Sequence, residues 1–240
     1  MHVTLTIIRY PKRYTYFALL AMAVHRLPFS LNKNLSFYKL MGSGKNGTFD
    51  KHPDWQQWAV LAVHKKPVSL QEPGEPGHIA SLYGAFIHNW FTRFKCETYT
   101  MLLEPIEGHG YWDKTEPFGK LPKHSPHEGV IGVMTRATIR MSKMRAFWNN
   151  VPAVAGKMNN TKGLYTSFGI GEIPFLKQAT FSVWESKEAM KDFAYRMKEH
   201  NDVIQKTRKE NWYSEELFVR FKLLLTIGTI HGHDPLEGKF

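Results

Sequence analysis

Alternating runs of apolar and polar residues recur along the chain, and stretches with helical periodicity separate them. Residues 4–9 and 134–140 read as extended segments that each end in a basic residue, Arg9 or Arg140. An aromatic-containing helical stretch follows each segment, and then come two strand-like segments, a second helical stretch and a last strand. Each half of the chain therefore has the order of the ferredoxin-like unit, strand, helix, strand, strand, helix, strand.

Several blocks of sequence occur twice in the same order, which indicates an internal duplication. They are the extended segment with its basic end, an aromatic strand with a Gly-x-Gly turn, a Gln-led strand, and a strand that runs into a Gly/His loop and an acidic-Pro turn. The paired copies lie at residues 4–9 and 134–140, 36–44 and 164–171, 57–63 and 178–184, and 100–117 and 222–235.

The duplication predicts an α+β fold made of two ferredoxin-like β-α-β-β-α-β repeats. We expect the first repeat at residues 1–115, a Pro- and Gly-rich linker at 116–128, and the second repeat at 129–240, all within one compact unit. Two such repeats can pack sheet on sheet, as a single-chain version of the dimeric α+β barrel, with helices outside and a cavity between the sheets. The alternative is that the repeats stack and leave no cavity.

Strand alternation in the second repeat predicts which side chains face that cavity. The smoother apolar faces are expected to meet the helices, which leaves a face rich in Arg, Thr, Ser and Trp toward the cavity. Its members are Met134, Arg136, Thr138 and Arg140 on one strand, and Gln178, Thr180, Ser182 and Trp184 on its partner.

Residues 187–211 form the best-defined predicted helix, which starts after Ser186 as its N-cap. Met190, Phe193, Met197 and Ile204 make its apolar stripe, and His200 lies about 20° from Phe193 on the helical wheel. A histidine on an apolar face needs a partner. Two interpretations stay open from spacing alone: a hydrogen-bonded core histidine, or a ligand of a metal or haem.

The composition indicates a globular protein that is rich in aromatic residues and strongly basic. The net charge is +11, which suits an anionic membrane surface or a cofactor with carboxylates. Basic residues form no long run, which argues against specific nucleic-acid binding. The lone Cys96 fits a reducing cytoplasm, and the apolar stretch 16–24 is too short to span a bilayer. We expect a cytoplasmic protein with peripheral contact at the inner face of the membrane.

Short strings along nearly the whole chain resemble the spheroidene monooxygenase family. They include 37–40 with Gly42-Ser43-Gly44, Trp112 with 116–118, 135–140, 147–148, 169–174, 178–184, 193–194, His200, 215–217 and 220–221. The resemblance implies the α+β barrel fold, haem b, and molecular oxygen as co-substrate. It also implies an external electron donor and an acyclic carotenoid substrate that is hydroxylated and then oxidised to a ketone. The aromatic side chains would line a tunnel for this apolar substrate.

The resemblance also implies roles for individual residues, since related barrels hold haem against a helix histidine. His200 is the expected axial ligand of the haem iron, and His88 is the second choice. The expected surroundings of the haem are Phe193, Arg196, Met197 and Trp184. Arg136 and Arg140 are the expected catalytic residues, which would bind haem propionates or donate a hydrogen bond to bound oxygen. The alternative is that both arginines are exposed at a sheet edge.

Other functions remain open at this point. One is another haem reaction on the same scaffold, such as aldoxime dehydration or peroxidation. A second is a non-enzymatic carrier of haem or an apolar ligand, and a third is an RNA-binding ferredoxin-like protein. His109, His231 and His233 are interpreted as solvated loop residues, because no Asp, Glu or Cys set with metal spacing accompanies them.

Overall fold

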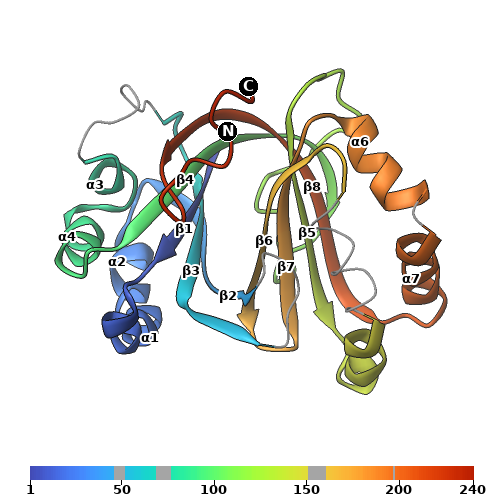
Figure 1. The fold of residues 1–240 in the computed structure, drawn as a ribbon, viewed down its shortest axis with the longest axis horizontal. Helices are drawn as coiled ribbons and strands as arrows, with labels where there is room; N and C mark the ends of the chain where they lie inside the picture. The colour runs from blue at the N-terminus through green and yellow to red at the C-terminus, as the bar shows by residue number, and fades with distance from the viewer. Residues whose placement is uncertain (46–51, 69–76, 151–160, 197) are drawn as a thin grey trace.

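Eight antiparallel strands close into a barrel in the computed structural model, and the helices lie outside it (Figure 1). The structure describes residues 1–45, 52–68, 77–150, 161–196 and 198–240, without the side chains of 195, 196, 198–202 and 204. The strands are β1 (His2–Arg9), β2 (Leu35–Gly44), β3 (Pro53–His64), β4 (Glu97–Gly110), β5 (Ile131–Ile139), β6 (Leu164–Ile173), β7 (Lys177–Trp184) and β8 (Tyr213–Gly228). The helical elements are η1 (Lys12–Tyr14), α1 (Thr15–Val24), α2 (Arg26–Leu31), α3 (His78–Tyr83), α4 (Ala85–Arg93), η3 (Met141–Lys143), residues 144–150, α6 (Lys187–Lys191), η4 (Asp192–Arg196) and α7 (Lys198–Lys209).

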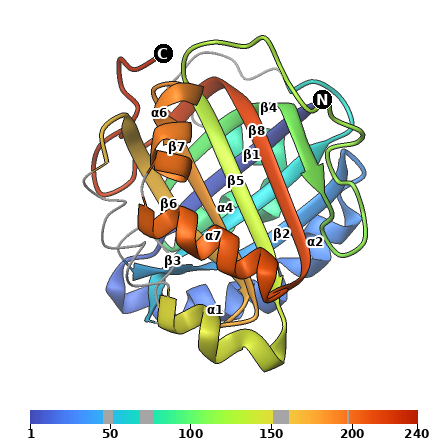
Figure 2. The same ribbon diagram turned by 90° about the vertical axis from the view of Figure 1, so that its right-hand side faces the viewer.

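The strand order around the barrel is β1-β3-β2-β6-β7-β5-β8-β4. It contains the series β4-β1-β3-β2 and β8-β5-β7-β6, so the two halves of the chain use the same strand order. Helices α1 to α4 cover the outside of the first half, and α6 and α7 cover the outside of the second (Figures 1 and 2). The predicted α+β barrel is confirmed, while the duplication itself and the boundaries at 115 and 129 stay predictions.

The two halves meet where β2 pairs with β6, through the Gly-x-Gly segments. Gly42 pairs with Gly171, and the Ser43 hydroxyl donates a hydrogen bond to the carbonyl of Gly169 at 3.0 Å. The prediction that these segments are turns is therefore wrong, because their glycines belong to paired strands. Gly110, which was expected in a loop, is likewise the last residue of strand β4. Its φ is +100°, and an added Cβ would lie 2.2 Å from the Glu216 carbonyl oxygen, so only glycine suits this contact.

The interior of the barrel is a packed apolar core. Leu5, Leu61, Met134, Phe181 and Phe221 are among its completely buried members. An eight-stranded barrel is just wide enough for side chains to fill it, and most of the side chains that fill this one are apolar. The expectation of a cavity between two sheets is wrong for the described residues, and so is the assignment of faces on β7.

On β7 the apolar residues Ala179, Phe181 and Val183 point into the barrel, and Trp184 packs on the outside with Met190 and Phe193. On β5 the predicted inward face is confirmed for Met134, which belongs to the interior cluster. The outer faces are therefore the surfaces that the helices cover, and they differ between the two halves.

Candidate functional site

The outer face of the second half carries two separate apolar clusters. Ile131 and Val133 of β5 pack with Trp184 and the α6–η4 segment at one end, whereas Ile139 packs with Trp148 and Trp212 at the other. Between them, Thr135 is exposed although it lies at the middle of a central strand. Its cross-strand partners, Thr180 and Phe218, are half-buried. We call Thr135, Thr180 and Phe218 the outer patch.

The corresponding surface of the first half is sealed. Thr6 of β1 is 0% exposed, and its hydroxyl lies 2.7 Å from the Tyr83 hydroxyl of α3 and 2.9 Å from that of Thr100. Tyr83 also donates a hydrogen bond to Thr4, and the surrounding apolar side chains form one continuous cluster with α1 to α4. The described residues thus leave Thr135 accessible on the outer face of the second half, whereas Thr6 is covered in the first.

The helical segment over the outer patch has an unusual backbone. Helix α6 begins at the predicted N-cap, where the Ser186 hydroxyl accepts a hydrogen bond from the Ala189 amide at 3.1 Å. It continues through a π-helical stretch, Asp192–Arg196, into α7. Such π-helical turns are rare and are frequent at functional sites. The segment therefore places a candidate binding surface opposite the outer patch.

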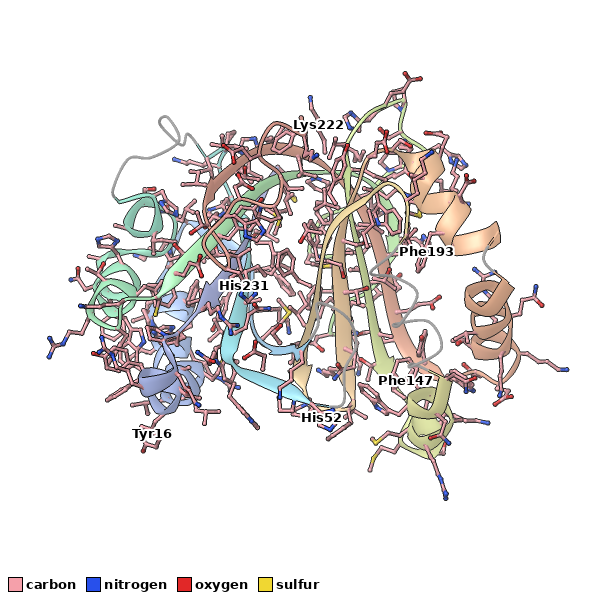
Figure 3. All side chains as sticks on the ribbon, viewed as in Figure 1. Tyr16, His52, Phe147, Phe193, Lys222 and His231 are labelled. Atoms are coloured by element: carbon pink, nitrogen blue, oxygen red, sulfur yellow. The ribbon has the colours of Figure 1, made fainter. Side chains whose placement is uncertain are left out.

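Phe193 and Trp184, which were both expected around the haem, contact each other with ring centroids 5.3 Å apart. Figure 3 shows Phe193 on the sheet side of the helices. His200 lies on α7, three residues before Val203. Val203 packs against the apolar cluster that contains Ile139 and Trp212. The side chains of His200 and Arg196, and residue Met197, lie outside the described residues, so their roles stay predictions. Trp184 lines the outer surface and not an inner cavity, as its place on β7 requires.

A buried ion cluster fixes the start of α6 to the sheet. Lys187 donates to the Glu107 carboxylate at 3.0 Å, and Arg220 donates to the same carboxylate. Burial raises the pKa of Glu107, but its bonds to Lys187 and Arg220 outweigh this and hold the pKa below its ordinary value. The Arg220 guanidinium also lies 4.9 Å over the Phe218 ring. This cluster therefore sets one edge of the outer patch.

An open groove of about 730 Å³ lies beside the outer patch, where α7 ends and β8 begins. Thr207 and Arg208 of α7 line it from one side, and His109, Lys114 and Glu216 line it from the others. His109 is not in a loop as predicted: it belongs to β4 and stacks on Phe218 with ring centroids 5.9 Å apart. We call this the C-terminal groove, and its volume is in the range of small-molecule sites.

Arg136 lies on the inner face of β5, opposite to the outer patch, and is 1% exposed. Its guanidinium donates to Glu215 and lies 3.5 Å from Asp113 and 3.7 Å from Glu172. It also sits 5.6 Å over the Trp112 ring. The alternative interpretation, that Arg136 is exposed at a sheet edge, is wrong for this residue, and its contacts with three carboxylates place it away from α7.

Two lysines complete this ion cluster at the end of the barrel. Lys39 binds Asp113 and lies 2.8 Å from Glu172, and Lys177 lies 2.6 Å from Asp113. Burial raises the pKa of Asp113, but hydrogen bonds from Lys177 and Lys39 outweigh it and lower the pKa to about 2. Three cations and three carboxylates thus balance, and we call this set the mouth cluster. Sequence analysis missed it because its members come from six separate segments.

The remaining candidate residues lie apart from the outer patch. Arg140 follows β5 and is exposed. His88 lies on α4 over the first half and is half-buried. His231 and His233 lie in an exposed turn, as predicted, with the His231 amide donating to Glu97 at 3.0 Å. The described residues contain no group of three His, Cys, Asp or Glu side chains that could hold a metal ion.

The closed antiparallel barrel with helices on its outside places the chain in the dimeric α+β barrel class. Solved structures agree on the fold: an aldoxime dehydratase has a TM-score of 0.61 at 12% identity, over 92% of this chain and 80% of its own. An aldoxime dehydratase crystallised with butyraldoxime also has a TM-score of 0.61, at 10% identity over 93% and 79%. At such identities the likeness concerns the fold alone.

Sequence relatives give the family. The spheroidene monooxygenase of Rhodobacter capsulatus is 34% identical over 220 residues, which are 91% of this chain and 88% of the relative. That of Cereibacter sphaeroides is 34% identical over 216 residues, and that of Rubrivivax gelatinosus 29% identical over 196. No family model matches. The chain belongs to the spheroidene monooxygenase family, and it spans 62% of the length of the Cereibacter sphaeroides relative.

Proposed function

We propose that the protein is a haem-dependent monooxygenase that oxidises a long apolar substrate of the carotenoid type. The observation that carries the proposal is the 34% identity to the Rhodobacter capsulatus spheroidene monooxygenase, which extends over 88% of that relative. The matched region is 220 residues long, which is 91% of this chain. Hydroxylation followed by oxidation to a ketone is the proposed outcome.

The described residues fit a flat, largely apolar cofactor with carboxylates. The outer patch offers the Phe218 ring and two small threonine side chains where the first half is sealed. Phe193 and Trp184 form an aromatic wall beside it. Lys114 and Arg208 line the C-terminal groove, and such cations are suitable partners for propionates. We therefore propose the haem site between α7 and the outer patch.

His200 is the proposed axial ligand, since α7 is the helix that faces the outer patch, and His88 is the second choice. Arg196 and Met197 are proposed as further contacts of the haem. When bound, haem would supply an iron centre that activates molecular oxygen, with electrons from an external donor. The Thr135 and Thr180 hydroxyls are the polar groups on the strand side and can donate hydrogen bonds to a bound ligand.

The contacts of Arg136 favour a structural role for this residue over the catalytic role that was expected, whereas Arg140 keeps a possible contact with a reaction partner. Arg136 is bound by Glu215, Glu172 and Asp113, so we propose that it holds the end of the barrel in place. Arg140 lies at the exposed end of β5, where it is available to a substrate or donor protein. An apolar substrate of this type resides in membranes, and the net charge of +11 favours an anionic membrane surface.

Spectroscopy and product analysis test the proposal together. The purified protein, supplied with haem, is expected to show a Soret band and to form an oxygenated product from an acyclic carotenoid with a reductant and air. The same sample without oxygen is the control and should form no product. A Soret band without product would contradict the monooxygenase and support a haem carrier. Product formation without haem would contradict the proposal that haem is the cofactor.

A further inference from the structure

Helices α1 and α2 form one nearly continuous helix from residue 15 to residue 31. The backbone stays helical at His25, with φ −70° and ψ −17°. The His25 amide donates to the Ala21 carbonyl at 2.9 Å, and the Phe29 amide donates to the His25 carbonyl at 3.1 Å. At about 1.5 Å per residue the helix is roughly 25 Å long. It lies along the outside of the barrel (Figure 1).

This helix is apolar on both sides. Its buried stripe is Ala18, Ala21, His25 and Phe29, each at most 5% exposed. The opposite stripe has the same helical spacing and points away from the barrel; it consists of Tyr16, Leu20, Leu27 and Leu31, with exposed fractions of 74, 40, 65 and 68%. Figure 3 shows Tyr16 at the outer edge of the molecule. A surface helix normally carries polar residues there, so this stripe has the composition of a covered face.

Among the described residues, the charged side chains on this helix and at its two ends are all positive. Lys12, Arg13, Arg26 and Lys33 flank or interrupt it, and all four are exposed. Neither Asp nor Glu occurs before Asp50, and residues 78–96, which include the neighbouring α4, contain none either. Phe86 of α4 is 50% exposed and lies 6.3 Å from the His25 ring, which extends the apolar surface. We call this surface the α1–α2 face.

We propose that the α1–α2 face docks on an anionic lipid bilayer, with the helix lying along the interface. Apolar side chains beside a one-signed basic rim are the features of interfacial helices. The helix does not cross the bilayer, since no described helix is long and apolar enough to do so. The inference deepens the membrane contact proposed above by naming its surface. It does not depend on haem.

A second copy of the chain is a less suitable occupant. A two-fold interface brings the same surface of both subunits together. It would therefore bring the basic rim of one copy, formed by Lys12, Arg13, Arg26 and Lys33, against the basic rim of the other, and the helix itself carries no carboxylate. Like charges facing each other across an interface are unfavourable, whereas an anionic bilayer neutralises all four.

Vesicle flotation tests the proposal with the purified protein. Vesicles of phosphatidylglycerol and phosphatidylcholine in equal parts are compared with phosphatidylcholine alone. Leu27→Ser with Leu31→Ser is expected to weaken binding to the anionic vesicles at least about tenfold. The control pair Met141→Ser and Ile173→Ser removes exposed apolar side chains elsewhere (80 and 44% exposed) and should bind like the wild type.

A second variant tests the basic rim. Arg13→Gln with Lys33→Gln should lower the partition coefficient about fivefold per cation and weaken its dependence on salt. Lys206→Gln with Lys209→Gln on α7 removes the same charge elsewhere and should have a smaller effect. Equal effects of the two charge pairs, or wild-type binding by the leucine variant, would overturn the proposal. The proposal would also be overturned if sedimentation showed that the wild type forms dimers, and if the leucine variant lost these dimers but still bound the vesicles.

Discussion

Thr135 and Thr6 hold matching places at the middle of the two central strands, yet Thr6 is completely buried and Thr135 is exposed. The Thr6 hydroxyl contacts Tyr83 of α3, which closes the outer face of the first half. Over Thr135, the described contacts of the helical segment lie at its two ends, in clusters that contain Phe193 and Val203. The asymmetry leaves Thr135 accessible on the outer face of the second half.

Filling the outer patch should exclude the ligand without unfolding the protein. Thr135→Leu adds an apolar side chain at an exposed strand position, so the free energy of unfolding should change by less than about 1 kcal/mol. Haem uptake, measured by the Soret band, should fall at least about tenfold. Lys222→Leu, also exposed on β8, is the control and should leave uptake unchanged. Normal haem uptake in Thr135→Leu would place the cofactor elsewhere.

The fold could be predicted from the sequence because the patterns that indicate its strands and helices are local. Strand alternation and repeated blocks predicted the α+β barrel, and Ser186 marked the start of α6. The sequence around β7 does not determine which face of this strand points into the barrel, because Trp184 on one face and Phe181 on the other are both suitable for a core. Closure of the barrel decides it, since the narrow interior takes Ala179, Phe181 and Val183.

The candidate site was predicted only in part for a related reason. Phe193 and Trp184 were both expected beside the haem, and the structure places their rings 5.3 Å apart. The outer patch escaped prediction because the exposure of a strand residue depends on where the helices pack on the sheet, which no residue pattern encodes. Arg136 was noticed as a cation, but its carboxylate partners, Glu172 and Glu215, come from β6 and β8 and meet it only after closure.

Removing the central cation of the mouth cluster should be costly. Arg136→Met would leave three carboxylates facing two lysines, and breaking a buried ion cluster costs about 3–5 kcal/mol. Lys177→Met removes a cation whose side chain is 24% exposed and should cost about 1 kcal/mol or less. Urea unfolding at neutral pH measures both. Equal losses would show that the burial of Arg136 does not matter.

Mild acid should destabilise the protein through His25. Burial lowers the pKa of His25 from 6.5 to about 4, so the folded state resists a proton that the unfolded state accepts. Stability is complete above pH 6.5 and is lost as the pH falls toward 4; at pH 5 the loss is about 2 kcal/mol.

The variant His25→Phe isolates this effect, because a small cavity and aromatic neighbours surround the side chain. Its free energy of unfolding should fall by about 2 kcal/mol less than that of the wild type between pH 7 and pH 5. His64, whose pKa burial also lowers to about 4, should account for part of the dependence that remains. Wild-type pH dependence in His25→Phe would contradict the assignment.

The role of His200 joins the helix to the proposed chemistry. If its imidazole is the axial ligand, His200→Ala should remove haem or its five-coordinate spectrum and abolish product formation, because the change deletes a bond to iron and little packing. If it is a hydrogen-bonded core histidine, the same change should cost about 1–3 kcal/mol of stability and leave haem bound. His88→Ala on α4 is the matched control and should retain both haem and activity. An unchanged Soret band in His200→Ala, with its loss in His88→Ala, would move the ligand to the first half of the chain.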